Sequence, residues 1–210
     1  MSSIPLEELA RIGSEIESTP PEERGDISNV EFAWLYTPRK PLQLLKRQTG
    51  EIASLLMMGG SGIVFEDYSE TSATAHVHNH PSGNMQPTLE DLNVLLGGVA
   101  RGENLSFSLI ASTHLGIVTG FYELEYNGER ANVAALMEGN KNIYRAHLAR
   151  KYDLLDRNPE LRAKMSVGDS ILSPQEYNAM VSEAMTSSSI VGRPRPLNGY
   201  RFKNWRFVSK

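Results

Sequence analysis

The sequence predicts an α/β or α+β fold, in which a mixed β-sheet is flanked by helices and followed by a C-terminal helical extension. Short runs rich in apolar, aromatic and β-branched residues predict strands at residues 30–36, 74–78, 106–112 and 116–126. Apolar residues at helical spacing follow Thr88, between the second and third of these runs. Beyond Asn127 the pattern is helical up to about residue 185. Strands interrupted by a helix, with further helices after them, favour this fold class.

The composition is that of an ordinary globular protein. The 210 residues are 40% hydrophobic, with a mean hydropathy of -0.34, and we expect one domain with additions. No apolar run is long enough for a membrane span, and the start lacks a basic segment followed by an apolar one. We therefore expect a cytoplasmic protein with no membrane partner. The chain has no cysteine, so a transition metal would have to be held by histidine and carboxylate.

The N-terminal part begins with an acidic amphipathic helix over residues 5–17, and a linker follows at 19–25. After the strand at 30–36, Thr37 and Pro38 can start a helix that continues to Gly59. The alternative for this region is a helix over 41–49 and a strand over 51–58. A strand at 62–68 then precedes the one that ends in the histidines.

The C-terminal part begins with the helix from Thr88 and the two strands at 106–112 and 116–126, which are joined near residue 114. Three helices are expected next, over 132–137, 141–155 and 159–165. Ser173, Pro174 and Glu176 combine an N-cap, a proline at N1 and a capping-box glutamate, so a last helix should start there. The segments 186–189 and 192–196 are expected as linker.

A metal site is predicted where the second strand ends. His78 and His80 are two residues apart on an extended backbone, so both side chains point to one side of the strand. Asp91 falls in the first turn of the helix that begins at Thr88, and the chain can turn at 81–83 to bring that helix end towards the strand. Two imidazoles, one carboxylate and a position left for water are the ligand pattern of a catalytic zinc. We therefore expect Zn²⁺ as the cofactor.

The other three histidines have plainer expected roles. His76 shares the face of His78 and His80, so it could support the ligands or contact a substrate, but we expect a strand-surface histidine. His114 is expected in a loop and His147 on a helix face. Neither has a ligand partner at a useful spacing.

The residues around the predicted site resemble a known family. The run from His78 to Gly83, followed by Pro87 to Asp91, resembles the H-x-H-P…S-x-x-D signature of the JAMM (MPN+) metalloproteases. Its residues are most similar to those of the RadC-like branch. The spacing from His80 to Asp91 is that of the family, whereas Thr88 stands where the family usually has serine. The resemblance covers residues 29–128. It implies a JAMM/cytidine-deaminase-like core, bound zinc, and hydrolysis of an amide or isopeptide bond in a protein or peptide substrate, such as a ubiquitin-like protein.

Thr88 has two roles that are compatible with each other. The resemblance implies that its hydroxyl stabilises the oxyanion of the tetrahedral intermediate. Its position before the helix predicts an N-cap, with Asp91 in the capping-box position.

The family also implies a glutamate that acts as general base, and two residues compete for this role. Glu31 lies in a strand similar to the RadC-like E-x-F strand, and Glu51 lies in a segment similar to the family's E-x-x-G-L-L-x-G pattern. We favour Glu31, because a strand that it begins can lie beside the end of the strand that carries the histidines. A strand that Glu51 begins would instead leave its base at the opposite edge of the sheet.

Four segments follow from these expectations. Residues 1–28 form an acidic helix and linker, 29–128 the JAMM-like metal-binding core, 129–185 a helical extension, and 186–210 a basic, aromatic tail. After Glu183 the chain has six basic residues and no acidic one, which suits either a solvated end or a nucleic-acid contact. The extension could cover a substrate or form a homo-oligomer contact. Two other functions stay open: a binding or assembly module without turnover, and a RadC-like nucleic-acid-associated protein.

Overall fold

A computed structural model describes residues 3–19, 33–44, 74–80, 85–101, 107–114, 117–164 and 171–197 of the chain. The helices are α1 (Leu6–Ser18), α4 (Leu89–Arg101), α5 (Val133–Arg157), α6 (Pro159–Lys164) and α7 (Pro174–Ser187), with the 3-10 turn η1 (Arg130–Asn132) before α5. The strands are β1 (Ala33–Tyr36), β2 (Gln43–Leu44), β3 (Ala75–Asn79), β4 (Phe107–His114), β5 (Ile117–Tyr126) and β6 (Ile190–Pro196).

The strands form one mixed sheet in the order β2-β1-β3-β4-β5-β6. Only β3 and β4 are parallel, and the other neighbours are antiparallel. A parallel pair needs a long crossover connection, and α4 provides it here. The sequence prediction of a mixed sheet flanked by helices is therefore confirmed.

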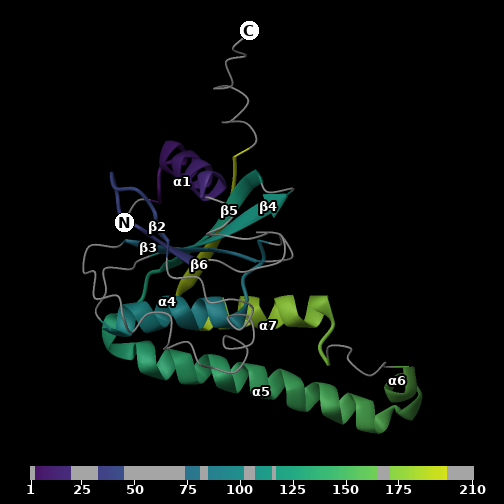
Figure 1. Cartoon of the computed structure of the whole chain (residues 1–210). Coiled ribbons are helices and arrows are strands. Elements are labelled where there is room, and N and C mark those ends of the chain that lie inside the picture. Colours follow the sequence, from purple (N-terminus) through teal and green to yellow (C-terminus); the bar gives the residue numbers. More distant parts are fainter. Residues whose placement is uncertain are drawn as a thin grey trace.

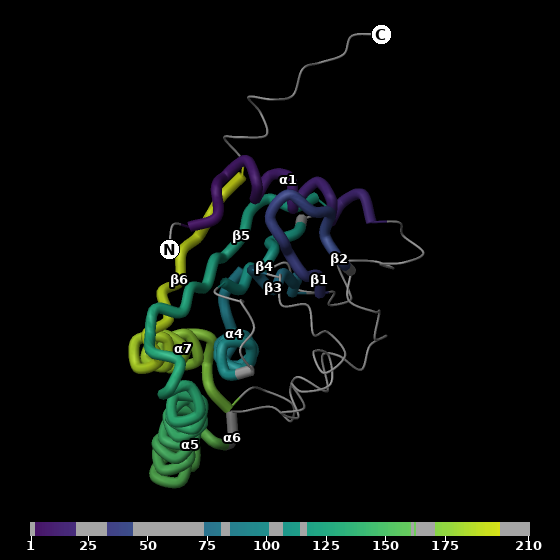
Figure 2. Tube along the Cα trace, turned by 90° about the vertical axis from the view of Figure 1, so that its left-hand side faces the viewer, coloured from purple at the N-terminus to yellow at the C-terminus, as the bar shows by residue number. Residues whose placement is uncertain are grey.

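The helices cover the two faces of the sheet unequally (Figure 1). Of the described helices, α1 lies on one face, whereas α4 and α7 lie against the other face and α5 forms a further layer beyond them; Figure 2 shows the same succession from the side. Each face has its own apolar core. One core joins α1 to residues such as Trp34, Val77 and Phe121, and the other joins α4 and α7 to Ile110 and Leu124.

The two helices next to the site form for local reasons that are visible in the sequence. In α4, Leu89, Leu92 and Leu96 recur at helical spacing and are buried. In α7, the Ser173 side chain accepts from the Glu176 N–H while the Glu176 side chain accepts from the Ser173 N–H. This is the predicted capping box, with Pro174 in the first turn.

Three predicted elements need correction. The helix expected from Pro38 does not form over the described residues, because a turn at 38–40 leads into β2, which pairs with β1. The helices expected over 132–137 and 141–155 are one continuous helix, α5. The linker expected over 192–196 is instead β6, paired with β5 along its whole length.

The prolines in this segment are the reason that a linker was predicted in place of β6. β6 is an outer strand of the described sheet. Pro194 and Pro196 have no N–H group to donate, and an outer strand tolerates them because these positions can face its unpaired side. Two arginines of the predicted basic tail are in this strand. Arg195 forms an ion pair with Glu123 at 2.8 Å, and Arg193 forms an ion pair with Glu125.

Several predictions lie outside the described residues. They are the strand at 62–68, both candidate bases, Glu31 and Glu51, and the tail beyond residue 197. The division of the chain into four segments stays a prediction. None of the described helices is both long and apolar enough to cross a membrane.

Candidate metal centre

The two predicted histidine ligands lie at the end of β3, an inner strand of the sheet. The β1–β3 register pairs Ala33 with His78, and the parallel β3–β4 register pairs His78 with Ile110. Ala75 and Val77 belong to the core on the α1 side, so the alternating His76 and His78 face the side that α4 covers. The strand therefore delivers His78 to the helix that carries Asp91.

α4 supplies the third residue from its first turn. Asp91 is the third residue of the helix, and its side chain is buried against the end of β3. The His78 Nε2 atom is 2.8 Å from Asp91 Oδ1, and the His80 Nε2 atom is 3.3 Å from Asp91 Oδ2. The two imidazole Nε2 atoms are 3.2 Å apart. The structure thus brings together all three predicted metal ligands.

These separations fit a metal ion. Ligand atoms bound tetrahedrally at about 2.1 Å from an ion are about 3.4 Å from one another, and octahedral neighbours at the same bond length are about 3.0 Å apart. The three observed distances, 2.8, 3.2 and 3.3 Å, are close to these values. His78, His80 and Asp91 can therefore hold one metal ion.

The three side chains differ in their exposure to solvent. The exposed fraction is 3% for the His78 side chain, 8% for Asp91 and 13% for His80. All three side chains are thus largely buried, and His80 is the most exposed of them. In catalytic zinc sites, three protein ligands leave a fourth position for an exchangeable ligand.

The electrostatics of the site favour an ionised Asp91. Burial alone would raise the pKa of this carboxyl, but the charges of His78 and His80 and their hydrogen bonds outweigh burial and hold the pKa well below its usual range. Asp91 is therefore a carboxylate throughout the physiological pH range. A permanent negative charge between two imidazoles is suited to a bound cation.

Thr88 orients the Asp91 carboxylate. The Thr88 backbone N–H and the Thr88 hydroxyl donate to Asp91 Oδ2 at 2.6 and 2.9 Å, and the Asp91 N–H donates to Thr88 Oγ at 3.3 Å. These contacts make the predicted N-cap and capping box at the start of α4. The single hydroxyl hydrogen of Thr88 is used by Asp91, so the role as oxyanion donor stays a prediction.

No protein-family model, curated protein or solved structure matches this chain. The resemblance to the JAMM metalloproteases therefore stays a prediction from the sequence between His78 and Asp91.

The prediction for His76 was wrong, because this histidine is buried and not on the strand surface. Its ring stacks on His78, with ring centres 5.1 Å apart and an interplanar angle of 27°. Burial, and to a lesser extent the charge of His78, lower the pKa of His76 to about 3. A neutral ring therefore packs behind His78 and restricts its rotation. His147, as expected, is on a helix, where its Nε2 atom is 2.8 Å from Glu183. The prediction of a loop for His114 was wrong, because this residue ends β4 and pairs with Ile117 of β5.

The sequence analysis missed Tyr177 of α7 as a neighbour of the site. Its hydroxyl accepts a hydrogen bond from the Leu89 N–H, at 3.4 Å, in the same turn of α4 that carries Asp91. The two residues are 88 positions apart in the chain. No local pattern could have indicated this contact, because it depends on how α7 packs against α4.

Proposed function

We propose that this chain is a zinc-dependent hydrolase of the JAMM type that cleaves an amide or isopeptide bond in a protein or peptide, such as a ubiquitin-like protein. The observation that carries the proposal is the compact group of His78, His80 and Asp91, with separations that suit a small ion. Two imidazoles and a carboxylate suit zinc among the common metals. Calcium and magnesium prefer oxygen ligands, so they are disfavoured here.

Each ligand has a defined part in this function. His78 is buried and stacked on His76, so its ring is held in one orientation. The more exposed His80 borders the side from which substrate would arrive. Asp91, oriented by Thr88, contributes the negative charge. When bound, zinc would acidify a water molecule and polarise the scissile carbonyl group.

A carboxylate near the site has to accept a proton from the attacking water and return it to the leaving amine. We propose Glu31 for this role. Ala33, two residues after Glu31, is paired with His78, and two residues of chain span at most about 7 Å. Glu51 is seven residues from Leu44, the nearest described residue on its N-terminal side, and a segment of that length reaches about 24 Å. The short stretch of chain between Glu31 and the described pairing of Ala33 with His78 therefore supports Glu31, whereas the longer stretch from Leu44 does not favour Glu51.

Zinc content is the first test of this proposal. Elemental analysis of the purified wild-type chain should find about one zinc per chain, and Asp91→Ala should bring the content close to zero. Asp156→Ala is a matched control, because this aspartate is exposed and forms an ion pair with Arg162 far from the site. No zinc in the wild type, even after zinc is added, would contradict the proposal.

Turnover is the second test. Zinc-loaded wild type should cleave isopeptide-linked ubiquitin dimers or amide-linked fluorogenic peptides, and Glu31→Gln should abolish cleavage while the zinc content stays at one. If Glu51→Gln has that effect and Glu31→Gln does not, the assignment of the base is wrong. If the wild type binds zinc and cleaves none of these substrates, a binding module with a metal site but without turnover becomes the better description.

A further inference from the structure

The first turn of α4 is held by contacts from two directions. The first N–H groups of a helix have no partner within the helix. Here the Asp91 N–H donates to Thr88 Oγ and the Leu92 N–H donates to the Thr88 carbonyl, both from the chain just before the helix. The Leu89 N–H donates instead to the hydroxyl of Tyr177 on α7. A side chain from the helical extension thus caps the helix that carries the Asp91 ligand.

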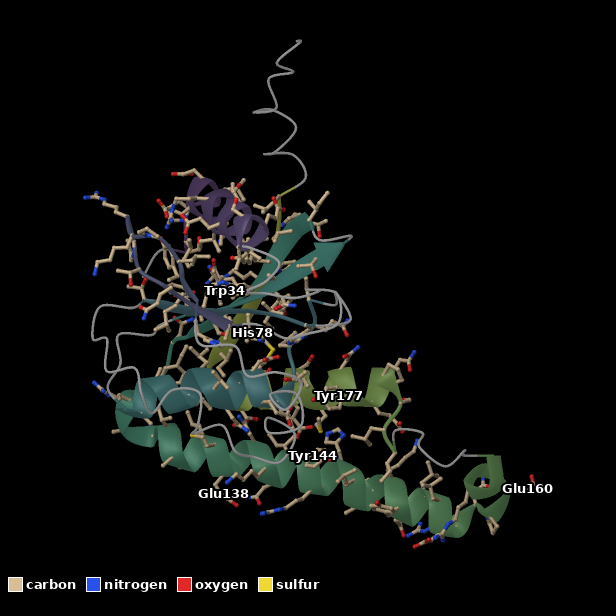
Figure 3. All side chains as sticks on the ribbon, viewed as in Figure 1. Trp34, His78, Glu138, Tyr144, Glu160 and Tyr177 are labelled. Atoms are coloured by element: carbon tan, nitrogen blue, oxygen red, sulfur yellow. The ribbon has the colours of Figure 1, made fainter. Side chains whose placement is uncertain are left out.

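Tyr177 is itself well fixed. It is in the first turn of α7, where the Ser173–Glu176 capping box forms and where the Tyr177 N–H donates to the Ser173 carbonyl at 2.9 Å. The Glu176 carboxylate also accepts from Lys151 of α5, with both oxygens 2.9 Å from Nζ. The ring packs against the apolar core between α4 and α7. Figure 3 labels Tyr177 on α7 and His78 in the sheet, whose one face α4 and α7 cover.

The protonation of Tyr177 suits this role. Burial, followed by the negative charge of Glu90, raises the pKa of the phenol well above its usual value. The hydroxyl is therefore neutral at physiological pH, and its oxygen can accept from Leu89.

We propose that Tyr177 is a positioning residue for the metal centre: its hydroxyl fixes the first turn of α4 so that the Asp91 carboxylate faces His78 and His80. This inference rests on the metal site of the proposed function and goes beyond it, because it couples that site to the helical extension. α5 and α7 would then act on the metal through one hydrogen bond. Loss of the hydroxyl leaves the Leu89 N–H without its partner and loosens the turn two residues before Asp91.

Cobalt binding to the full-length chain tests the coupling, because Co²⁺ replaces Zn²⁺ in such sites and its visible absorption reports the ligand geometry. Tyr177→Phe keeps the ring and removes only the hydroxyl. It should bind Co²⁺ about tenfold more weakly than wild type, as expected for residues that support metal ligands, and it should change the absorption spectrum. Tyr144→Phe is the matched control, because this tyrosine is on α5 and 41% exposed, and its affinity and spectrum should equal those of wild type.

Amide hydrogen exchange in the metal-free protein gives a second measurement. In Tyr177→Phe the Leu89 amide should exchange faster than in wild type, whereas the Ala184 amide, near the far end of α7, should not change. A Leu89 amide that keeps its exchange rate, or a cobalt affinity and spectrum equal to wild type, would overturn the inference. Neither measurement uses turnover, so a wild type that binds cobalt but cleaves nothing would end the hydrolase proposal and leave this one intact.

Discussion

At the scale of single residues, Thr88 decides how firmly the aspartate ligand is held. Its hydroxyl and its N–H both donate to Asp91, and its Oγ accepts from the Asp91 N–H. Thr88→Ala removes the helix cap, which should cost about 1 kcal/mol of stability, and should weaken zinc binding about tenfold. Thr88→Ser should preserve both. Thermal unfolding and titration against a zinc-chelating dye would measure these effects. Unchanged stability and affinity in Thr88→Ala, with turnover lost, would instead favour the oxyanion role.

Also at this scale, the buried His76 should make stability depend on pH. Its pKa is about 3 in the folded chain and about 6.5 when unfolded. Between these values the unfolded state binds one more proton, so stability falls as the pH is lowered. His76 alone should cost about 2 kcal/mol between pH 6.5 and pH 5. Urea unfolding of metal-free wild type and His76→Gln at both pH values should show a smaller loss in the variant. Equal losses would mean that His76 becomes protonated in the folded state.

At the scale of elements, α5 shows how tertiary contacts override a local pattern. Gly139 and Asn140 favour a break, yet the helix runs through them. The Asn140 side chain is buried and bonded to Asn93 of α4 and to Ser188 at the end of α7, and these contacts hold the helix together. A methyl group added at Gly139 would meet nothing within 4 Å. Gly139→Ala should therefore stabilise the chain by about 0.5–1 kcal/mol, measured by urea unfolding. A destabilised variant would mean that this glycine is needed for more than helix continuity.

The difference between local sequence patterns and tertiary contacts also explains which parts of the structure the sequence could predict. β3, α4 and the start of α7 were predictable because their information is local: alternating apolar residues, leucines at helical spacing, and the capping residues Thr88 and Ser173. The candidate metal ligands were predictable for the same reason, since they lie at the ends of two such elements. β6 was not predictable from local information. Its prolines are tolerated only in an outer strand, and its arginines form ion pairs with Glu123 and Glu125 of the neighbouring strand. No local sequence pattern indicates the contact from Tyr177 or the burial of His76.

At the scale of the whole molecule, the sheet needs the helical extension. Among the described residues on the α4 face, six of the twelve buried core residues come from beyond residue 128 and the other six from α4, β4 and β5. The six from the extension and β6 are Val133, Leu172, Met180, Val181, Ala184 and Ile190. Each large apolar side chain contributes about 1.5–3 kcal/mol when buried, so together they contribute about as much as the whole stability of a typical domain, about 5–15 kcal/mol. The segment with the candidate metal ligands and the extension therefore share one core.

A chain that ends at Gly128 should consequently not fold, although it contains His78, His80, Asp91 and both candidate bases. We expect no cooperative transition in urea, followed by circular dichroism, and no binding of cobalt in the tetrahedral form, because the first turn of α4 loses the packing of α7 and the cap from Tyr177. The full-length chain with Tyr144→Phe is the folded control. A cooperative transition of the shortened chain, with a denaturant dependence in proportion to its length, would show that residues 29–128 are an independent domain. In that case the extension would not be needed for the segment with the metal site to fold.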